Sequence, residues 1–268
     1  MSGSGVERIA EAFARARADG RTAALMPYMM GGFPDLETSR RIGEAYVDAG
    51  ADLIELGVPF SDPLADGPVI HAAATTALAA GVTLTDVVAL GAQLGHRVPV
   101  ILMCYVNPIL ARGVERFADM LRDAGISGLI VPDVPVEESG ALSAACAARD
   151  LGYVPLVAPT TSPQRMTAVG EAARGFLYVV GVTGTTGERA AQGDGAAALL
   201  ARARAATDVP VALGFGISTP EQAVAAAAAG ADGVIVGSRL VRAAGAQDGG
   251  VEAVAGLVHD LSTALTTA

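Results

Sequence analysis

Short apolar segments, separated by longer stretches with a helical pattern, limit the possible folds of this chain more than any other feature. The intervals between them run about 20 to 45 residues, which leaves room for a helix in each connection, and parallel strands require such crossovers. Several segments are continuously apolar, as expected for strands that are covered on both faces. The pattern predicts eight parallel strands, at residues 24–30, 52–58, 98–106, 128–131, 153–158, 176–182, 209–215 and 232–237.

Eight β/α units favour closure of the sheet into a barrel. With 51% apolar residues and 17% charged residues, the chain has enough material for one large core, and no linker-like segment divides it. We therefore expect an α/β fold in which residues 1–268 form a single (β/α)8 TIM barrel domain. An open, doubly wound sheet is the alternative that the pattern leaves open.

Local signals place several helices of this barrel. Val6, Ile9, Ala10 and Phe13 recur at helical spacing, which predicts an extra N-terminal helix that covers the lower end of the barrel. Further along, Ser162-Pro163 and Thr219-Pro220 each place a capping hydroxyl before a proline, so helices are expected to begin there.

Charge and terminal sequence exclude several kinds of partner. The formal net charge is −10 and no basic run occurs, which argues against nucleic acid. The same charge does not attract anions, so a phosphate group would have to be bound by local backbone N–H donors. Because no signal peptide and no 18-residue apolar stretch is present, we expect a cytoplasmic protein without a membrane segment.

Cysteine and histidine give no sign of a metal centre. Cys104 and Cys146 lie in apolar or Ala-rich surroundings and are expected to be reduced core thiols. The three histidines lack metal-ligand spacing, so no metal is predicted.

Acidic residues at the end of the second strand form the first candidate site, because active sites of such barrels lie at the C-terminal ends of the strands. In DLIELGVPFSDPLADGP, residues 52–68, Glu55 interrupts the apolar strand and Asp62 and Asp66 follow in a proline-bounded loop. Glu55 is either a buried structural acid or a carboxyl with a raised pKa that exchanges protons. For the two aspartates, the simpler interpretation is that they hydrogen-bond to the backbone in turns or at helix starts.

Glycine-rich strand ends form the second candidate site. GFGIS (214–218) and IVGS (235–238) each precede a helix, and glycines let backbone amides approach phosphate oxygens. The glycines alternatively serve only the turns. A third region, GVTGTTGERAAQGDG (181–195), reads either as a lid over a ligand or as a disordered loop. Together these regions predict a phosphate-binding barrel enzyme.

A family resemblance narrows this prediction. The segments ELGVPFSDPLADGP, PDVPVEES, VTGTTG, GFGIS and VGS, in this order and spacing, resemble the tryptophan synthase alpha family over nearly the whole chain. The resemblance implies a lyase of L-tryptophan biosynthesis that splits indole-3-glycerol phosphate into indole and glyceraldehyde 3-phosphate.

The resemblance also implies roles for individual residues. The catalytic glutamate falls on Glu55, its partner aspartate on Asp66, and a hydroxyl partner on Tyr178. The lid hydroxyl near the aspartate falls on Thr186. The remaining positions are those of the phosphate site, at Gly187, Gly216, Gly237 and Ser238, and those of the indole pocket, at Tyr28, Tyr105, Ile130 and Phe215.

A partner is implied in the same way. The family works with a beta subunit that carries pyridoxal phosphate, in an alpha2beta2 tetramer, so this chain itself is expected to hold no cofactor. The loop around Asp62 and Pro63 and the helix near Asn107 and Pro108 would face that subunit.

Three positions depart from the family pattern. Phe33 stands where many members have an acidic residue, Gly181 replaces a serine, and Pro132 replaces a small residue beside the indole pocket. These departures leave the implied reaction intact and bear on pocket size and lid behaviour.

Three alternatives remain at this stage. The first is a stand-alone lyase that releases free indole. The second is a non-catalytic barrel subunit that activates a partner, against which the presence of both Glu55 and Asp66 argues. The third is a different phosphate-binding barrel, such as a sugar-phosphate isomerase, which residues 52–68 do not fit.

Overall fold

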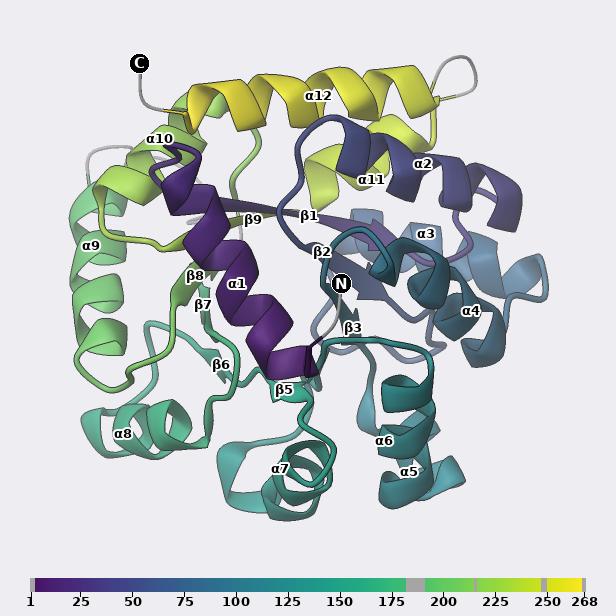
Figure 1. Ribbon diagram of the computed structural model, residues 1–268, viewed down its shortest axis with the longest axis horizontal. Helices are drawn as coiled ribbons and strands as arrows, with labels where there is room; N and C mark the ends of the chain where they lie inside the picture. Colours follow the sequence, from purple (N-terminus) through teal and green to yellow (C-terminus); the bar gives the residue numbers. More distant parts are fainter. Residues whose placement is uncertain (1–2, 182–190, 215, 247–249, 267–268) are drawn as a thin grey trace.

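The strands form one parallel sheet that the helices surround (Figure 1). The computed structural model describes residues 3–181, 191–214, 216–246 and 250–266. In the described part the sheet has nine strands in the order β5-β4-β3-β2-β1-β9-β8-β7-β6. Their bounds are β1 (Ala24–Met30), β2 (Ile54–Gly57), β3 (Val100–Met103), β4 (Gly128–Ile130), β5 (Gly152–Tyr153), β6 (Leu156–Val157), β7 (Leu177–Val180), β8 (Val211–Gly214) and β9 (Gly233–Val236).

A single predicted strand, 153–158, accounts for both β5 and β6 and closes the barrel. Proline has no N–H to donate, and Pro155 interrupts the strand. On one side of the break, the Val154 N–H donates to the Leu129 carbonyl of β4 at 3.0 Å. On the other side, the Pro155 carbonyl accepts from the Tyr178 N–H of β7 at 3.1 Å. One chain segment therefore joins both ends of the strand order, which confirms the (β/α)8 barrel and excludes the open sheet.

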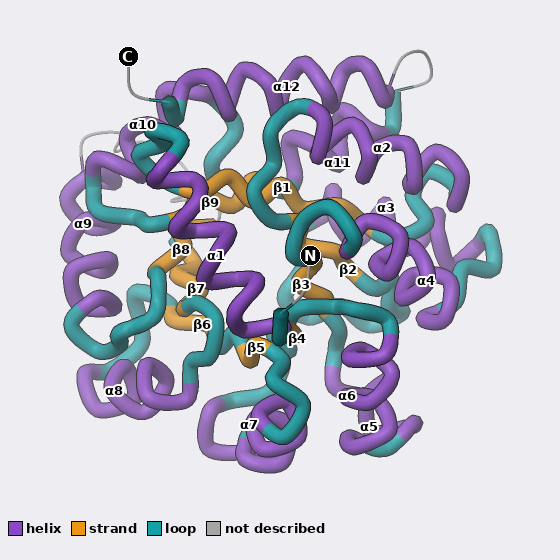
Figure 2. The backbone as a smooth tube through the Cα atoms, in the orientation of Figure 1, coloured by secondary structure: helices purple, strands orange, loops and turns teal. Residues whose placement is uncertain are grey.

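The helices enclose the barrel in the middle of the molecule (Figure 2). Several β/α connections carry a second, shorter helix besides the one that packs on the sheet. The bounds are α1 (Gly5–Ala18), α2 (Leu36–Asp48), α3 (Pro68–Ala79), α4 (Leu84–Gly95), α5 (Val106–Arg112), α6 (Val114–Asp123), the 3-10 helix η1 (Val136–Glu138), α7 (Gly140–Ala147), α8 (Pro163–Ala172), α9 (Ala191–Arg204), α10 (Pro220–Ala228), α11 (Ser238–Ala244) and α12 (Gly250–Ala264).

Two expected element boundaries were wrong. The segment 98–106 was expected to be a single strand, but β3 ends at Met103 and α5 begins at Val106, where the Val106 N–H donates to the Asp133 carboxylate at 3.0 Å. That bond satisfies one of the free donors at the helix start. In addition, residues 191–195 of the expected loop 181–195 belong to α9. The proline-marked helix starts were confirmed, since Ser162 and Thr219 cap α8 and α10.

Side chains alternate between two cores along each strand, because successive residues of a strand point to opposite faces. In β3, Val100 and Leu102 pack outward under the helices, whereas Ile101 points into the barrel. The inner core also holds Met26 of β1 and Ile130 of β4. This alternation decides which strand residues can reach a cavity inside the barrel.

The N-terminal helix α1 closes one end of the barrel and crosses in front of the strands in Figure 1. Ile9 and Phe13 are buried among the inward-facing strand residues, and the rings of Phe13 and Phe176 lie 5.9 Å apart. Gly152 and Gly175 leave room for Ile9, whose side chain would meet a Cβ at either position within 3.0 Å. The expected covering helix is therefore confirmed.

Arg8 connects this helix to the barrel loops through hydrogen bonds. Its guanidinium donates to the carbonyls of Gly125 (2.9 Å) and Val98 (3.3 Å), and also to that of Gly95. The side chain is 6% exposed, so this face of α1 includes a buried cation. Ala10, which the helical spacing assigned to the buried face, lies on the exposed side instead.

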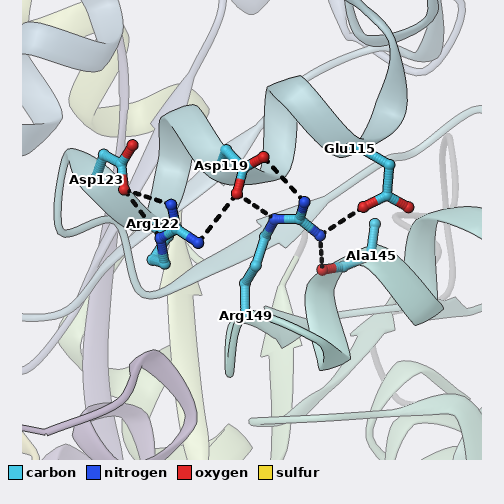
Figure 3. Close-up of polar contacts among 6 residues, drawn as sticks. All are labelled: Glu115, Asp119, Arg122, Asp123, Ala145 and Arg149. Atoms are coloured by element: carbon cyan, nitrogen blue, oxygen red, sulfur yellow. Dashed lines mark hydrogen bonds and ion pairs between the residues drawn. The ribbon is translucent and has the colours of Figure 1, made fainter.

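A network of ion pairs joins α6 to the end of α7 (Figure 3). The Arg149 guanidinium contacts Asp119 at 2.8 Å and Glu115 at 2.6 Å, and it also donates to the Ala145 carbonyl. Arg122 extends the network by pairing with Asp119 at 3.0 Å. These contacts fix two neighbouring outer helices to each other, at a distance from the inner cavity described below.

Two further predictions concern single residues and helix length. Cys104 and Cys146 are free and buried, as expected.

Among the described residues, no single helix has the length and apolarity to cross a membrane. Only α3 and α4 taken together meet those criteria, and they are bent by 109° relative to each other.

Candidate active site

A cavity of about 420 Å³ opens at the carboxyl ends of the strands, opposite α1. Its walls come from nearly every strand end of the barrel, as the fold requires of an active site. The residues that line it are Tyr28, Glu55, Ala65, Asp66, Gly67, Ile70, Met103, Pro132, Leu156, Tyr178, Val180, Gly216, Ile217, Ser218, Ile235, Gly237, Ser238, Arg239 and Arg242.

Glu55 is the acid that reaches this cavity from inside the barrel. It lies in β2, in register with Tyr28 of β1 and Ile101 of β3, and is 2% exposed. Its Oε2 has no hydrogen-bond partner among the described residues. Burial, and secondarily the Asp66 carboxylate, raises the pKa of Glu55 from 4.5 to about 8. The group can therefore carry a proton near neutral pH and release it.

Two tyrosines flank Glu55, and each occupies space left by a glycine. A Cβ on Gly57 would lie 2.1 Å from the Tyr28 hydroxyl, and a Cβ on Gly214 would lie 2.3 Å from that of Tyr178. The Tyr28 hydroxyl is buried without a hydrogen-bond partner among the described residues. Burial raises the pKa of both phenols, and the Glu55 carboxylate raises it further. Both hydroxyls remain protonated donors beside the acid.

Asp66 lies on the loop between β2 and α3, at the mouth of the cavity. Burial raises its pKa, while a hydrogen bond from Tyr105 and the nearby His71 lower it. Tyr105 fixes this loop, because its hydroxyl accepts from the Ala65 N–H at 3.1 Å and its ring stacks on Phe60 with centroids 5.2 Å apart. The loop thus presents a second, less buried carboxyl opposite Glu55.

Glycines and cations form another part of the wall. Gly216 has φ +80°, in the region that favours glycine, and Gly237 precedes α11. Ser238 begins α11, where the first N–H groups have no partner within the helix. Arg239 and Arg242 line the same cavity. This end has the hydrogen-bond donors and positive charge that suit an anion.

Some of the predicted site residues line the cavity and others do not. The cavity brings together Tyr28, Glu55, Asp66, Tyr178, Gly216, Gly237 and Ser238. Tyr105 contacts the Asp66 loop without lining the cavity, and Ile130 is fully buried in the inner core instead. Thr186, Gly187 and Phe215 lie outside the described residues.

The three family departures also have definite positions where they are described. Pro132 lines the cavity, as expected of a residue beside a pocket. Phe33 does not line it; its ring packs against the cluster that contains Tyr28 and Ile70 and lies near Gly245, where a Cβ would be 2.9 Å from it. The Gly181 N–H donates at 3.0 Å to the carbonyl of Gly214, the glycine that makes room for Tyr178.

Several lining residues were missed at the level of sequence. Met103, Leu156, Val180 and Ile235 supply an apolar wall at strand ends, and their inward direction follows from the two-residue period once the strand register is known. The two arginines were missed because spacing along the chain does not show which side chains of the helix after residues 235–238 line the cavity. Among the described residues, no group of His, Cys, Asp or Glu is placed to hold a metal ion.

Comparison with known proteins identifies the family of this chain. A sequence profile of the family described as "Tryptophan synthase alpha chain" matches residues 13–264. Tryptophan synthase alpha chains of Synechococcus elongatus and Synechocystis sp. are each 50% identical to this chain, over 259 and 247 residues; the first alignment covers 96% of both chains, and the second covers 91% of this chain and 94% of the relative.

Solved structures give the same assignment. A Mycobacterium tuberculosis tryptophan synthase structure superposes with a TM-score of 0.89 at 37% identity, over 99% of this chain and 100% of that one. A tryptophan synthase complex from Pyrococcus furiosus gives a TM-score of 0.81 at 31% identity, over 90% and 98% of the two chains. From its strand-end acids to its overall sequence, this chain belongs to the tryptophan synthase alpha chain family.

Proposed function

We propose that this chain is a carbon–carbon lyase that cleaves indole-3-glycerol phosphate into indole and glyceraldehyde 3-phosphate in L-tryptophan biosynthesis. The single observation that carries the proposal is Glu55, a buried carboxyl whose pKa of about 8 lets it exchange protons near neutrality, in a cavity with anion-binding features elsewhere in its wall. Residues 1–268 act as one barrel domain in this proposal, and the cytoplasmic location remains a prediction.

The bond to be broken joins C3 of the indole ring to the glycerol chain. Protonation of C3 makes the ring an electron sink, so the bond electrons can move into it when the bond breaks. In this mechanism Glu55 donates a proton to C3 and then accepts the proton of the adjacent glycerol hydroxyl, which becomes the aldehyde. The two transfers leave Glu55 in its original state.

Asp66 and Tyr178 assist this exchange. Asp66, at the mouth of the cavity, accepts from the indole N–H and stabilises the positive charge that develops on the protonated ring. The Tyr178 phenol, kept protonated beside Glu55, donates to the oxygen or carboxylate that carries charge. Tyr28 and the apolar strand ends position the indole ring, and the family resemblance adds Phe215. Tyr105 contributes through the Asp66 loop, whereas Ile130 lies in the inner core.

The phosphate group binds at the glycine-rich wall in this proposal. Backbone N–H groups near Gly216, Gly237 and Ser238 are the donors, and the family roles add Gly187 and Thr186 from the expected lid. Binding energy from this remote group orients the reacting end of the substrate.

A beta subunit completes the proposed enzyme. Tryptophan synthase alpha chains carry no cofactor, and the pyridoxal phosphate of the synthase belongs to the beta subunit. The similarity to the P. furiosus tryptophan synthase complex supports a partner subunit. The alpha2beta2 stoichiometry is what the family resemblance implies. Two apolar side chains are exposed in the segments that the family resemblance expects to face the partner. Leu64, at 90% exposure, lies in the Asp62–Pro63 loop, and Leu110, at 58%, lies in α5.

The decisive measurement is indole release from indole-3-glycerol phosphate by the purified chain, with and without a tryptophan synthase beta subunit. We expect slow release by the chain alone and strong acceleration by the beta subunit. Glu55→Gln is the matched blank and should lower kcat by roughly 10²–10⁴, the usual contribution of a positioned acid or base.

The other outcomes of this measurement are equally informative. Fast release without a beta subunit would replace the synthase component by a stand-alone lyase. Indole formation that does not depend on Glu55, or no indole under either condition, would contradict the proposed function.

A further inference from the structure

Arginine is the only basic residue type of this chain apart from histidine, since all 18 lysine-plus-arginine positions are arginines. Among the described arginines, most are occupied elsewhere: Arg21 pairs with Asp52 at 2.8 Å, for example, and Arg204 with Asp232 at 3.0 Å. Only Arg239 and Arg242 of the described arginines line the cavity. They are therefore the side-chain cations available to a ligand in it.

Both guanidiniums are free to bind such a ligand. Neither forms an ion pair or a side-chain hydrogen bond with another described residue. They are three residues apart on α11, so they project from the same side of that helix. Ser238, which also lines the cavity, lies directly before Arg239 in the first turn.

The charge of the molecule makes this placement significant. A net charge of −10 disfavours the approach of an anion, and the acidic side chain of Asp66 already lines the cavity. Backbone N–H donors supply only partial charges. Full positive charge at the cavity rim offsets the repulsion, and the planar guanidinium fork matches two oxygens of a phosphate.

We propose that Arg239 and Arg242 form a guanidinium clamp that binds the phosphate dianion of the substrate over the glycine-rich wall and the first turn of α11. This inference rests on the proposed function for the identity of the substrate, but not for the class of ligand. The clamp acts on binding and orientation, and the proton transfers at Glu55 proceed without it.

The test compares Arg239→Gln, Arg242→Gln and the double variant with the wild-type chain. Each single variant should raise KM for indole-3-glycerol phosphate by roughly tenfold, as for loss of a charge-assisted hydrogen bond, and should change kcat by less than about threefold. Arg239→Lys should fall between wild type and Arg239→Gln, because it keeps the charge and loses the fork. KM of the wild type should also rise with salt more steeply than that of the double variant.

Arg15→Gln is the matched control. Arg15 is an exposed arginine of α1, at the opposite end of the barrel, so the substitution changes net charge by the same amount. It should leave KM and its salt dependence unchanged. Because Arg239 and Arg242 are exposed, the variants should keep the wild-type Tm, which verifies that they fold.

A direct binding measurement separates this inference from the proposed reaction. Inorganic phosphate should bind the wild-type chain and Arg15→Gln alike, and the double variant at least about tenfold more weakly. If the wild type cleaves the substrate but the double variant keeps its KM and phosphate affinity, the clamp is wrong and the proposed function stands. If the wild type releases no indole while phosphate binding still depends on both arginines, the clamp stands and the proposed function is wrong.

Discussion

At the scale of single residues, glycine positions decide how much space the site has. Gly57 and Gly214 leave room for the Tyr28 and Tyr178 rings, whereas Gly237 faces the cavity with little protein above it. A Cβ at Gly237 would lie 3.7 Å from the nearest atom, the Tyr28 Cβ, which is ordinary contact. Gly216 differs, because its φ of +80° would strain any other residue.

Gly237→Ala is therefore the cleaner test of the phosphate wall. We expect KM for indole-3-glycerol phosphate to rise by roughly tenfold, because the new methyl group takes the place of phosphate oxygens, while kcat and Tm change little. Steady-state kinetics measure KM and kcat, and a thermal melt measures Tm.

Gly140→Ala is the control for this substitution. Gly140 also lies at the start of a helix, α7, and a Cβ there would meet nothing within 4 Å. Its kinetics should match those of the wild type. An unchanged KM in Gly237→Ala would remove this residue from the phosphate site.

At the scale of elements, α1 illustrates what a pattern of apolar spacing can and cannot predict. The spacing of Ile9 and Phe13 correctly predicted a helix that covers the barrel. It could not show that Arg8 lies on the buried face, since a buried cation depends on carbonyls from distant loops. Those carbonyls belong to turns that follow α4 and α6.

Arg8→Met should loosen α1 without affecting the chemistry. The substitution leaves the buried carbonyls of Gly95 and Val98 without this donor, and also removes the bond to Gly125, at a cost of about 1–3 kcal/mol in the free energy of unfolding. Urea unfolding and amide hydrogen exchange of α1 measure the effect, and kcat should remain near the wild-type value.

Arg15→Met provides the comparison on the same helix. Arg15 is exposed, so its loss should change the free energy of unfolding by less than about 0.5 kcal/mol. Equal stability of the two variants would show that the Arg8 contacts do not hold the helix in place.

At the scale of the whole molecule, the buried acid should cost stability as the pH rises. Glu55 has a folded pKa of about 8 against an ordinary value of 4.5. Between these values the unfolded chain releases a proton that the folded chain keeps, so the free energy of unfolding falls with increasing pH. Below about pH 4.5 Glu55 is protonated in both states and does not change the free energy of unfolding. Above about pH 8 it is ionised in both states, and the free energy of unfolding falls no further on its account.

Glu55→Gln should remove this dependence, because glutamine does not titrate. The stability of the variant relative to the wild type should therefore increase from about pH 5 to pH 8, by at most about 1.4 kcal/mol per pH unit and a few kcal/mol in total. Urea unfolding across this range measures the difference. A difference that stays constant with pH would show that Glu55 is ionised in the folded chain.

The sequence by itself determined the elements and their order. Apolar runs at regular intervals predicted the parallel strands, Glu55 stood out as an acid within an apolar strand, and the segment 52–68 identified the acidic loop. These features depend on spacing along the chain, which the residues carry without reference to their distant neighbours.

Only the tertiary structure decided how these parts meet. Closure through Pro155 brings the strand ends together, the enclosed barrel raises the pKa of Glu55 by removing it from water, and α11 brings Arg239 to the cavity beside Gly216. The physical reason is that burial, electrostatic neighbours and cavity walls come from segments far apart in the chain. Such properties exist only after the barrel has closed.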